Sequence, residues 1–154
     1  MTIRKFRSED LSQILAMTRE CWDGVSYDQV WEKTFGKGDK NWWEYKADSL
    51  KKFIQAHPRW VFVAEEDGTI LGYATYSINR ERKIGEVLNN AVHPKHRGKG
   101  VGGALHRRVL EELKKEGMKF AHLVTSSLTP SAVKMYESAG FKLIYHTLHY
   151  AKKL

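Results

Sequence analysis

Hydrophobic and polar residues follow two different periods along this chain, and together they predict a mixture of strands and helices. Apolar runs typical of strands cover residues 2–7, 60–64, 70–78, 84–92 and 120–126, and residues 141–151 are predicted to form one or two closing strands. Helical spacing of apolar residues begins after Ser8 and recurs over residues 28–34, 41–56, 100–116 and 130–139. The pattern therefore alternates between the two kinds of element.

Capping residues set the expected ends of these helices. Ser8 is a good N-cap for the first helix, and Thr129 followed by Pro130 predicts the start of the last one. Pro58 ends the helix over residues 41–56, and Gly117 and Gly140 follow two further helices as C-terminal caps.

The order of elements predicts an α/β or α+β fold with a mixed sheet. The strand 84–92, the helix 100–116 and the strand 120–126 form a crossover unit that we expect to be parallel and right-handed. A chain of 154 residues fits one domain, residues 1–154, with a sizeable core.

Composition narrows the compartment and the partners. No apolar run approaches the roughly 18 residues of a membrane span, and the N-terminus has no signal-peptide pattern, so we expect a cytosolic protein without a membrane partner. Cys21 is the only cysteine, which excludes an internal disulfide. Lys and Arg outnumber Asp and Glu by 26 to 18, and the charge of +8 favours an anionic partner: nucleic acid, anionic lipid or a polyphosphate cofactor.

A glycine-rich segment between Val92 and Gly103 is the strongest single feature. Its glycines expose backbone N–H groups where a helix begins, which is how proteins bind phosphate. Gly98 to Gly103 matches a dinucleotide fingerprint, but the acidic residue required at the end of the next strand is missing from His122 to Ser127. No Gly-Lys-Ser or Gly-Lys-Thr occurs, which excludes a Walker loop.

Two spaced motifs identify a better match. Arg97-x-x-Gly100-x-Gly102, preceded by Val92-x-Pro94 and followed by an amphipathic helix, resembles the acetyl-CoA pyrophosphate loop of the GCN5-related N-acetyltransferase (GNAT) superfamily. Downstream, Ala132-x-x-x-Tyr136-x-x-x-Gly140-Phe141 resembles the second signature of that family. The order of elements fits over nearly the whole chain, although only residues 84–145 carry specific motifs.

The resemblance implies a mixed, mostly antiparallel sheet flanked by helices, with central strands that splay apart around acetyl-CoA. No metal is expected, because the close histidine pair, His93 and His96, has no carboxylate or thiol nearby. It implies that a backbone N–H of Ala91 or Val92 polarises the thioester carbonyl. Thr129 stands where the family often has an asparagine, so its contact with the pantetheine arm departs from the family pattern. The implied pyrophosphate site comprises Arg97, Gly98, Lys99, Gly100, Val101, Gly102 and Gly103.

Two residues are candidates for acid–base catalysis. The resemblance implies that Tyr136 protonates the coenzyme A thiolate, a task suited to a phenol that stays protonated at neutral pH. Glu86 aligns with a glutamate that acts as general base in some relatives, and it shares a face with Leu88 and Asn90 if the strand has no bulge. The alternatives are a core aromatic for Tyr136 and a surface carboxylate for Glu86.

The acceptor is the least determined part of the prediction. Asn89 and Asn90 interrupt an apolar strand, so at least one is expected to face a polar cleft. The tryptophan-rich stretch 22–43 and residues 146–150 fall where the family binds its acceptor, which we expect to be a small-molecule or peptide amine. A polycation is not favoured by the sequence, because the chain is basic and has no acidic cluster. Packing of the core or of a dimer is the alternative for these aromatics, and the chain is expected to be a monomer or homodimer. An acyl-CoA sensor without turnover and a nucleic-acid-binding module are the competing functions.

Overall fold

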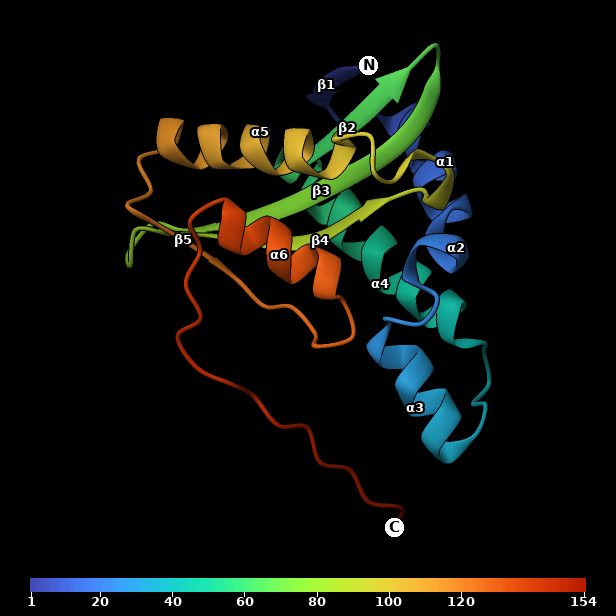
Figure 1. Ribbon diagram of the computed structural model, residues 1–154. Coiled ribbons are helices and arrows are strands. Elements are labelled where there is room, and N and C mark those ends of the chain that lie inside the picture. Colours follow the sequence, from blue (N-terminus) through green and yellow to red (C-terminus); the bar gives the residue numbers. More distant parts are fainter.

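A five-stranded sheet forms the centre of the computed structural model, which describes all residues 1–154 (Figure 1). The strands follow chain order across the sheet; the first four strands form three antiparallel pairs, and the fourth strand pairs with the fifth in parallel. The mixed, mostly antiparallel sheet confirms the predicted fold class. The strands are β1 (Thr2–Lys5), β2 (Val61–Glu66), β3 (Thr69–Asn79), β4 (Ile84–Val92) and β5 (Phe120–Leu123).

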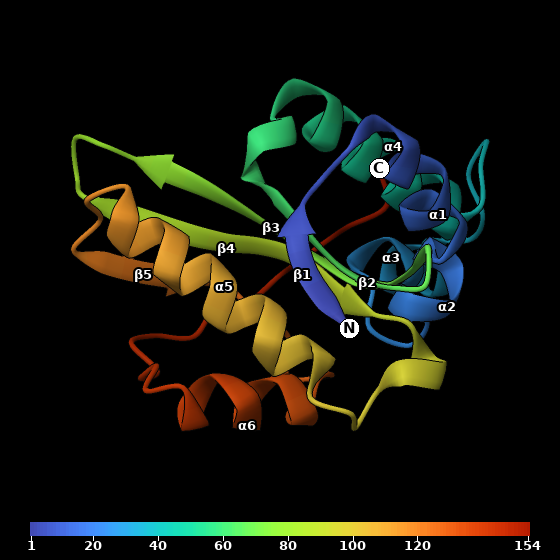
Figure 2. The ribbon, with the colours of Figure 1, turned by 90° about the horizontal axis from the view of Figure 1, so that it is seen from above.

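Helices cover both faces of the sheet, as the view from above shows (Figure 2). One face carries α5 (Val101–Lys115) and α6 (Pro130–Ser138), and the other carries α1 (Leu11–Ala16), α2 (Thr18–Trp22) and α4 (Trp42–Ala56). Helix α3 (Tyr27–Phe35) packs against α4 farther from the sheet, and short 3-10 helices span Ser8–Asp10, Pro58–Trp60 and Pro94–His96. No helix has the length and apolar character needed to cross a membrane.

The hydrophobic core divides at the sheet into two clusters. On the α5 side, the predicted stripe Val101, Leu105, Val109 and Leu113 is buried to 3% exposure or less, which confirms the helical period. Each such aliphatic side chain contributes about 1.5–3 kcal/mol by leaving water. On the other side, α1, α2 and α4 pack on Val61, Val63, Ile70 and Tyr73.

The first helix begins differently from the prediction. Ser8 starts a 3-10 turn and does not cap the helix; instead the Asp10 carboxylate accepts the Arg7 backbone N–H at 2.7 Å. The same carboxylate binds the Arg4 guanidinium with two hydrogen bonds of 2.7 and 2.8 Å. Asp10 is buried, and a buried charge must be paired to be tolerated. Because Arg4 supplies that pairing, Asp10 and not Ser8 stabilises this turn.

The prediction of closing strands over residues 141–151 is wrong. Phe141 is anchored by its N–H, which donates to the Tyr136 carbonyl at 3.0 Å, but residues 142–154 make no backbone–backbone hydrogen bond. A strand forms only where a neighbouring strand takes its hydrogen bonds, and none lies beside this segment. The chain instead runs away from α6 toward α3, where the His149 ring lies 5.6 Å from that of Tyr27 (Figure 1).

Candidate active site

Strand β4 separates from β5 halfway along its length. The two strands pair only from Ile84↔Phe120 to Val87↔Leu123, whereas β4 continues beside β3 to Val92. The backbone edge of β4 beyond Val87 is therefore free of β5. This opening lies between α5 and α6 on one face and α2 and α4 on the other.

Backbone N–H groups along the open part of β4 differ in direction. The His93 N–H donates to the Leu71 carbonyl of β3 at 2.9 Å. Because alternate N–H groups of a strand point to the same side, the Ala91 N–H also points toward β3, and the Val92 N–H points to the open edge. Of the two residues proposed to polarise a carbonyl, Val92 is the one with the suitable direction.

The glycine loop lies at the end of this opening and begins α5. Gly98 and Gly100 have φ angles of +74° and +80°, a conformation that favours glycine, and Gly100 is the N-cap of the helix. The first intrahelical bond runs from Ala104 N–H to Gly100, which leaves the N–H groups of the first turn without helical partners. No side chain caps them. A Cβ at Gly98, Gly100 or Gly103 would meet nothing within 4 Å, so the loop is open to a ligand.

The side chain of Arg97 holds the loop in place. Its Nε donates to the Val92 carbonyl at 3.1 Å, and its Nη2 donates to the Cys21 carbonyl at 3.0 Å. Burial raises the pKa of the Cys21 thiol to about 11, so this cysteine is a neutral core residue. Arg97 therefore connects β4 and α2 to the glycine loop, while Lys99 is exposed.

Tyr136 reaches the open strand from the opposite helix. It is 7% exposed on α6, and its hydroxyl accepts a hydrogen bond from Asn90 Nδ2 at 3.0 Å. Burial raises the pKa of the phenol, and the bond from Asn90 opposes that effect. The ring packs 5.3 Å from His106, whose Nε2 is buried without a partner and whose pKa is lowered by burial. The phenol therefore stays protonated at neutral pH.

Thr129 occupies the predicted N-cap position of α6 without making a cap bond. Its hydroxyl donates to the Ser126 carbonyl at 2.7 Å and lies 3.0 Å from the hydroxyl of Thr125. The side chain stabilises the turn between β5 and α6.

A bulge in β4 moves Glu86 to the opposite face from Asn90. The β3–β4 register shifts between Ala74 and Tyr76, which inserts one extra residue of β4 between the two positions. Glu86 Oε1 lies 3.2 Å from Nδ1 of His122 on β5, and Ser77 Oγ donates to the other oxygen at 3.3 Å. Sequence reasoning did not single out His122, because only the pairing Glu86↔His122 brings the two side chains together.

Lys46 of α4 is a second residue that sequence reasoning missed. Its Nζ donates to Asn89 Oδ1 at 2.6 Å and lies 3.8 Å above the ring of Trp22. Burial lowers the pKa of this ammonium, and the negative charge of Asp28 raises it. Asn89 and Asn90 thus face opposite sides of the opening, one toward Lys46 and one toward Tyr136, and both meet polar partners.

Comparison with known proteins places this arrangement in context. The sequence model described as Acetyltransferase (GNAT) family matches residues 16–141. No group of three or more His, Cys, Asp and Glu side chains is arranged to hold a metal ion. Mycothiol acetyltransferase of Streptomyces griseus is 36% identical over 84 residues, which are 54% of this chain and 27% of that protein. N-acetylaspartate synthetase of Rattus norvegicus is 35% identical over 104 residues, which are 68% of this chain and 35% of that protein. The similarity thus spans about a quarter to a third of these relatives.

Solved structures share the fold over nearly the whole chain. The PaiA N-acetyltransferase of Thermoplasma acidophilum, in complex with coenzyme A, superposes with a TM-score of 0.72 at 22% identity, covering 93% of this chain and 90% of that one. An N-acetyltransferase of Staphylococcus aureus Mu50 gives a TM-score of 0.69 at 23% identity, covering 92% and 82% of the two chains.

Proposed function

Because the chain belongs to the acetyltransferase (GNAT) family, we propose that it transfers the acetyl group of acetyl-CoA to a primary amine. One observation carries the proposal: the open edge of β4 runs from the glycine loop to the Tyr136 hydroxyl. A cofactor with a pyrophosphate at one end and a thioester at the other fits such a track. We expect a cytosolic protein that acts on a small-molecule or peptide amine.

The cofactor is held mainly by backbone. Its pyrophosphate accepts from the N–H groups of the first turn of α5, where the helix dipole adds favourable charge. The open edge of β4 would hold its pantetheine arm. The Val92 N–H donates to the thioester carbonyl and stabilises the negative charge that develops on that oxygen.

The reaction needs one proton acceptor and one proton donor. The amine nitrogen attacks the thioester carbonyl, the N–C bond forms and the C–S bond breaks. Glu86, with His122 beside it, accepts the proton lost by the amine, directly or through a water molecule. The Tyr136 hydroxyl gives its proton to the departing thiolate, and Asn90 holds that hydroxyl at the edge of the strand.

A panel of amines and peptides, scored by release of free coenzyme A thiol, tests the proposal. We expect turnover of at least one amine, and a fall of about 10²-fold in kcat for Tyr136→Phe, the lower end of general acid catalysis. Tyr145→Phe in the exposed C-terminal segment is the matched control and leaves kcat unchanged. Binding of acetyl-CoA without thiol release from any amine would instead identify an acyl-CoA sensor.

A further inference from the structure

Helix α3 exposes an aromatic face that the proposed reaction does not use. The rings of Tyr27, Trp31 and Phe35 follow one another at helical spacing, with centroids 6.2 and 4.8 Å apart, and each ring residue is at least 38% exposed. An exposed apolar patch of this kind marks a binding surface more often than a random surface does. The three rings form one wall of a cavity of about 590 Å³ between α3 and α4, within the range of small-molecule sites.

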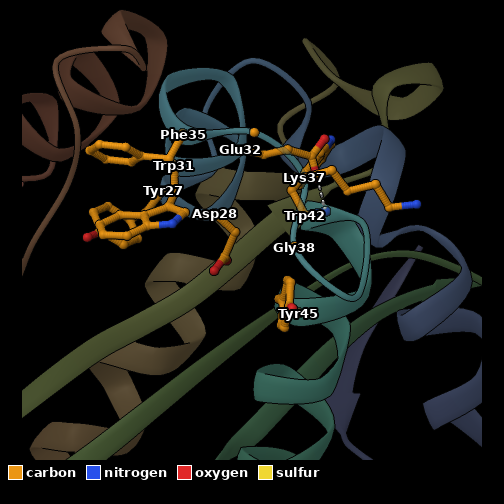
Figure 3. A pocket seen from close by; sticks show the side chains of 10 residues that line it. Tyr27, Asp28, Trp31, Glu32, Phe35, Lys37, Gly38, Trp42 and Tyr45 are labelled. Atoms are coloured by element: carbon orange, nitrogen blue, oxygen red, sulfur yellow. Dashed lines mark hydrogen bonds between the residues drawn. The ribbon is translucent and has the colours of Figure 1, made fainter. Parts of the chain in front are cut away.

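Two carboxylates line the same cavity. In Figure 3 the three rings of α3 lie on one side, Tyr45 of α4 lies on the other, and the Asp28 side chain projects between them. Glu32 uses one oxygen to accept the Trp42 backbone N–H at 2.8 Å, which fixes α4 against α3. Asp28 has only a 3.4 Å contact from the Ser26 hydroxyl.

Neither Asp28 nor Glu32 forms an ion pair, although Lys37 also lines the cavity. A neutral apolar ligand, or the apolar face of another chain, would cover Asp28 without supplying a counter-charge, which is unfavourable. Aromatic faces attract organic cations, and a nearby carboxylate adds an opposite charge. The charge and shape of the cavity therefore favour an ammonium ligand.

Helix α4 connects the cavity with the open strand. Tyr45 lines the cavity, and the next residue, Lys46, donates to Asn89 of β4 at 2.6 Å. The negative charge of Asp28 raises the pKa of Lys46, so the carboxylate at the cavity and the ammonium at the strand interact. The polarity thus reverses between the two ends: carboxylates at the cavity and an ammonium at the strand. A positive charge beside a second amine favours the neutral, nucleophilic form of that amine.

We propose that the cavity between α3 and α4 binds one protonated amino group of the acceptor, and that the acceptor is a diamine or polyamine whose other amino group is acetylated at β4. The proposal rests on the proposed acetyltransferase function for its second half. Its first half, the binding of an organic cation, is independent of any reaction.

Hexamethonium tests that first half, because its two quaternary ammonium groups cannot be acetylated. Titration of the full chain with hexamethonium, followed by calorimetry and by tryptophan fluorescence, is expected to show binding that weakens with added salt. Asp28→Asn and Trp31→Leu each weaken it by roughly tenfold or more. The matched control Asp48→Asn removes a carboxylate of α4 that pairs with Lys40 outside the cavity, and leaves it unchanged. Hexanediol, the neutral analogue, does not bind.

Turnover tests the second half. The ratio of kcat/KM for hexamethylenediamine to that for hexylamine is expected to exceed roughly tenfold in the native chain and to fall toward one in Asp28→Asn, through KM. Equal ratios in both proteins, or hexamethonium binding that ignores Asp28→Asn, would overturn the proposal while acetyl transfer to hexylamine upheld the function. The proposal would also be overturned if the native chain does not bind hexamethonium but self-associates in sedimentation, and Trp31→Leu loses that self-association. The aromatic face would then be a dimer interface. Absence of both acetyl-CoA binding and turnover would contradict the function itself.

Discussion

The amide of Asn90 and the hydroxyl of Tyr136 face each other across the open strand, with Nδ2 3.0 Å and Oδ1 3.3 Å from the phenol oxygen. This pair is the only side-chain hydrogen bond that joins α6 to β4, and it aims the proposed proton donor at the edge where a thioester would lie. Leucine has nearly the same shape as asparagine, so replacing Asn90 by leucine removes the hydrogen bond with little change in packing.

Replacing Asn90 by Leu tests whether this contact positions the acid. The bond from Asn90 lowers the pKa of Tyr136, so its loss is expected to raise that pKa. The alkaline limb of the pH profile of kcat then moves to higher pH, because the phenol stays protonated longer, while the plateau falls by about tenfold through lost positioning. An alkaline limb that stays in place while kcat falls would show that Tyr136 is not the proton donor.

The buried imidazole of His106 is expected to make the fold sensitive to acid. Burial lowers its pKa in the folded state, whereas the unfolded chain has the ordinary value of about 6.5. The unfolded state therefore binds the proton first, so stability is fully present above about pH 6.5 and declines as pH falls below it. Urea unfolding at a series of pH values is expected to show a smaller acid loss in His106→Leu than in the native chain. His146→Gln in the exposed C-terminal segment is the control, and equal slopes in all three proteins would contradict the prediction.

Arg97 is predicted to stabilise the fold as well as the cofactor loop. Arg97→Gln removes hydrogen bonds from a charged donor to the carbonyls of Val92 and Cys21, and is expected to cost about 1 kcal/mol of unfolding free energy, since the group is partly exposed. Arg97→Lys restores at most one of the two bonds and is expected to fall between. The midpoint of urea unfolding measures this. A normal midpoint combined with weaker acetyl-CoA binding would mean that the guanidinium serves the phosphates and not the loop.

Glu86 and His122 are predicted to act as one unit. Glu86→Gln and His122→Gln are each expected to lower kcat/KM for the amine by about 10²-fold, and the double variant to be little worse than either single one. Ser77→Ala, which removes the weaker contact to Glu86, is expected to change kcat/KM by less than tenfold. Two effects that multiply in the double variant would show that the residues act separately.

Features set by neighbouring residues could be predicted from the sequence. The stripe on α5 follows from the helical period, and the break before it follows from Gly98 and Gly100, since glycine adopts a positive φ without steric cost. The two family motifs have fixed local spacing, so Gly102 and Tyr136 could be selected without a structure.

Features that depend on strand register could not. One extra residue in β4 places Glu86 and Asn90 on opposite faces of the sheet, and no residue type in the sequence indicates this bulge. The contact of Lys46 with Asn89 joins positions 43 apart, and that of Glu86 with His122 joins positions 36 apart. The prediction of closing strands over residues 141–151 is wrong for a related reason. Apolar alternation is typical of a strand, but it does not show whether a neighbouring strand is present to pair with it.

Calorimetric titration with acetyl-CoA tests the central claim most directly, that the loop before α5 and the open edge of β4 form a cofactor site. Gly102→Asp places a carboxylate in the first turn without strain, because a Cβ there makes only ordinary contacts of 3.6 Å with Val92 and Met135. Ser49→Asp adds the same charge on the exposed face of α4. We expect acetyl-CoA to bind the native chain and the Ser49→Asp variant, and binding to be lost in a folded Gly102→Asp variant. A native chain that does not bind acetyl-CoA, or a folded Gly102→Asp variant that binds it equally well, would contradict this claim.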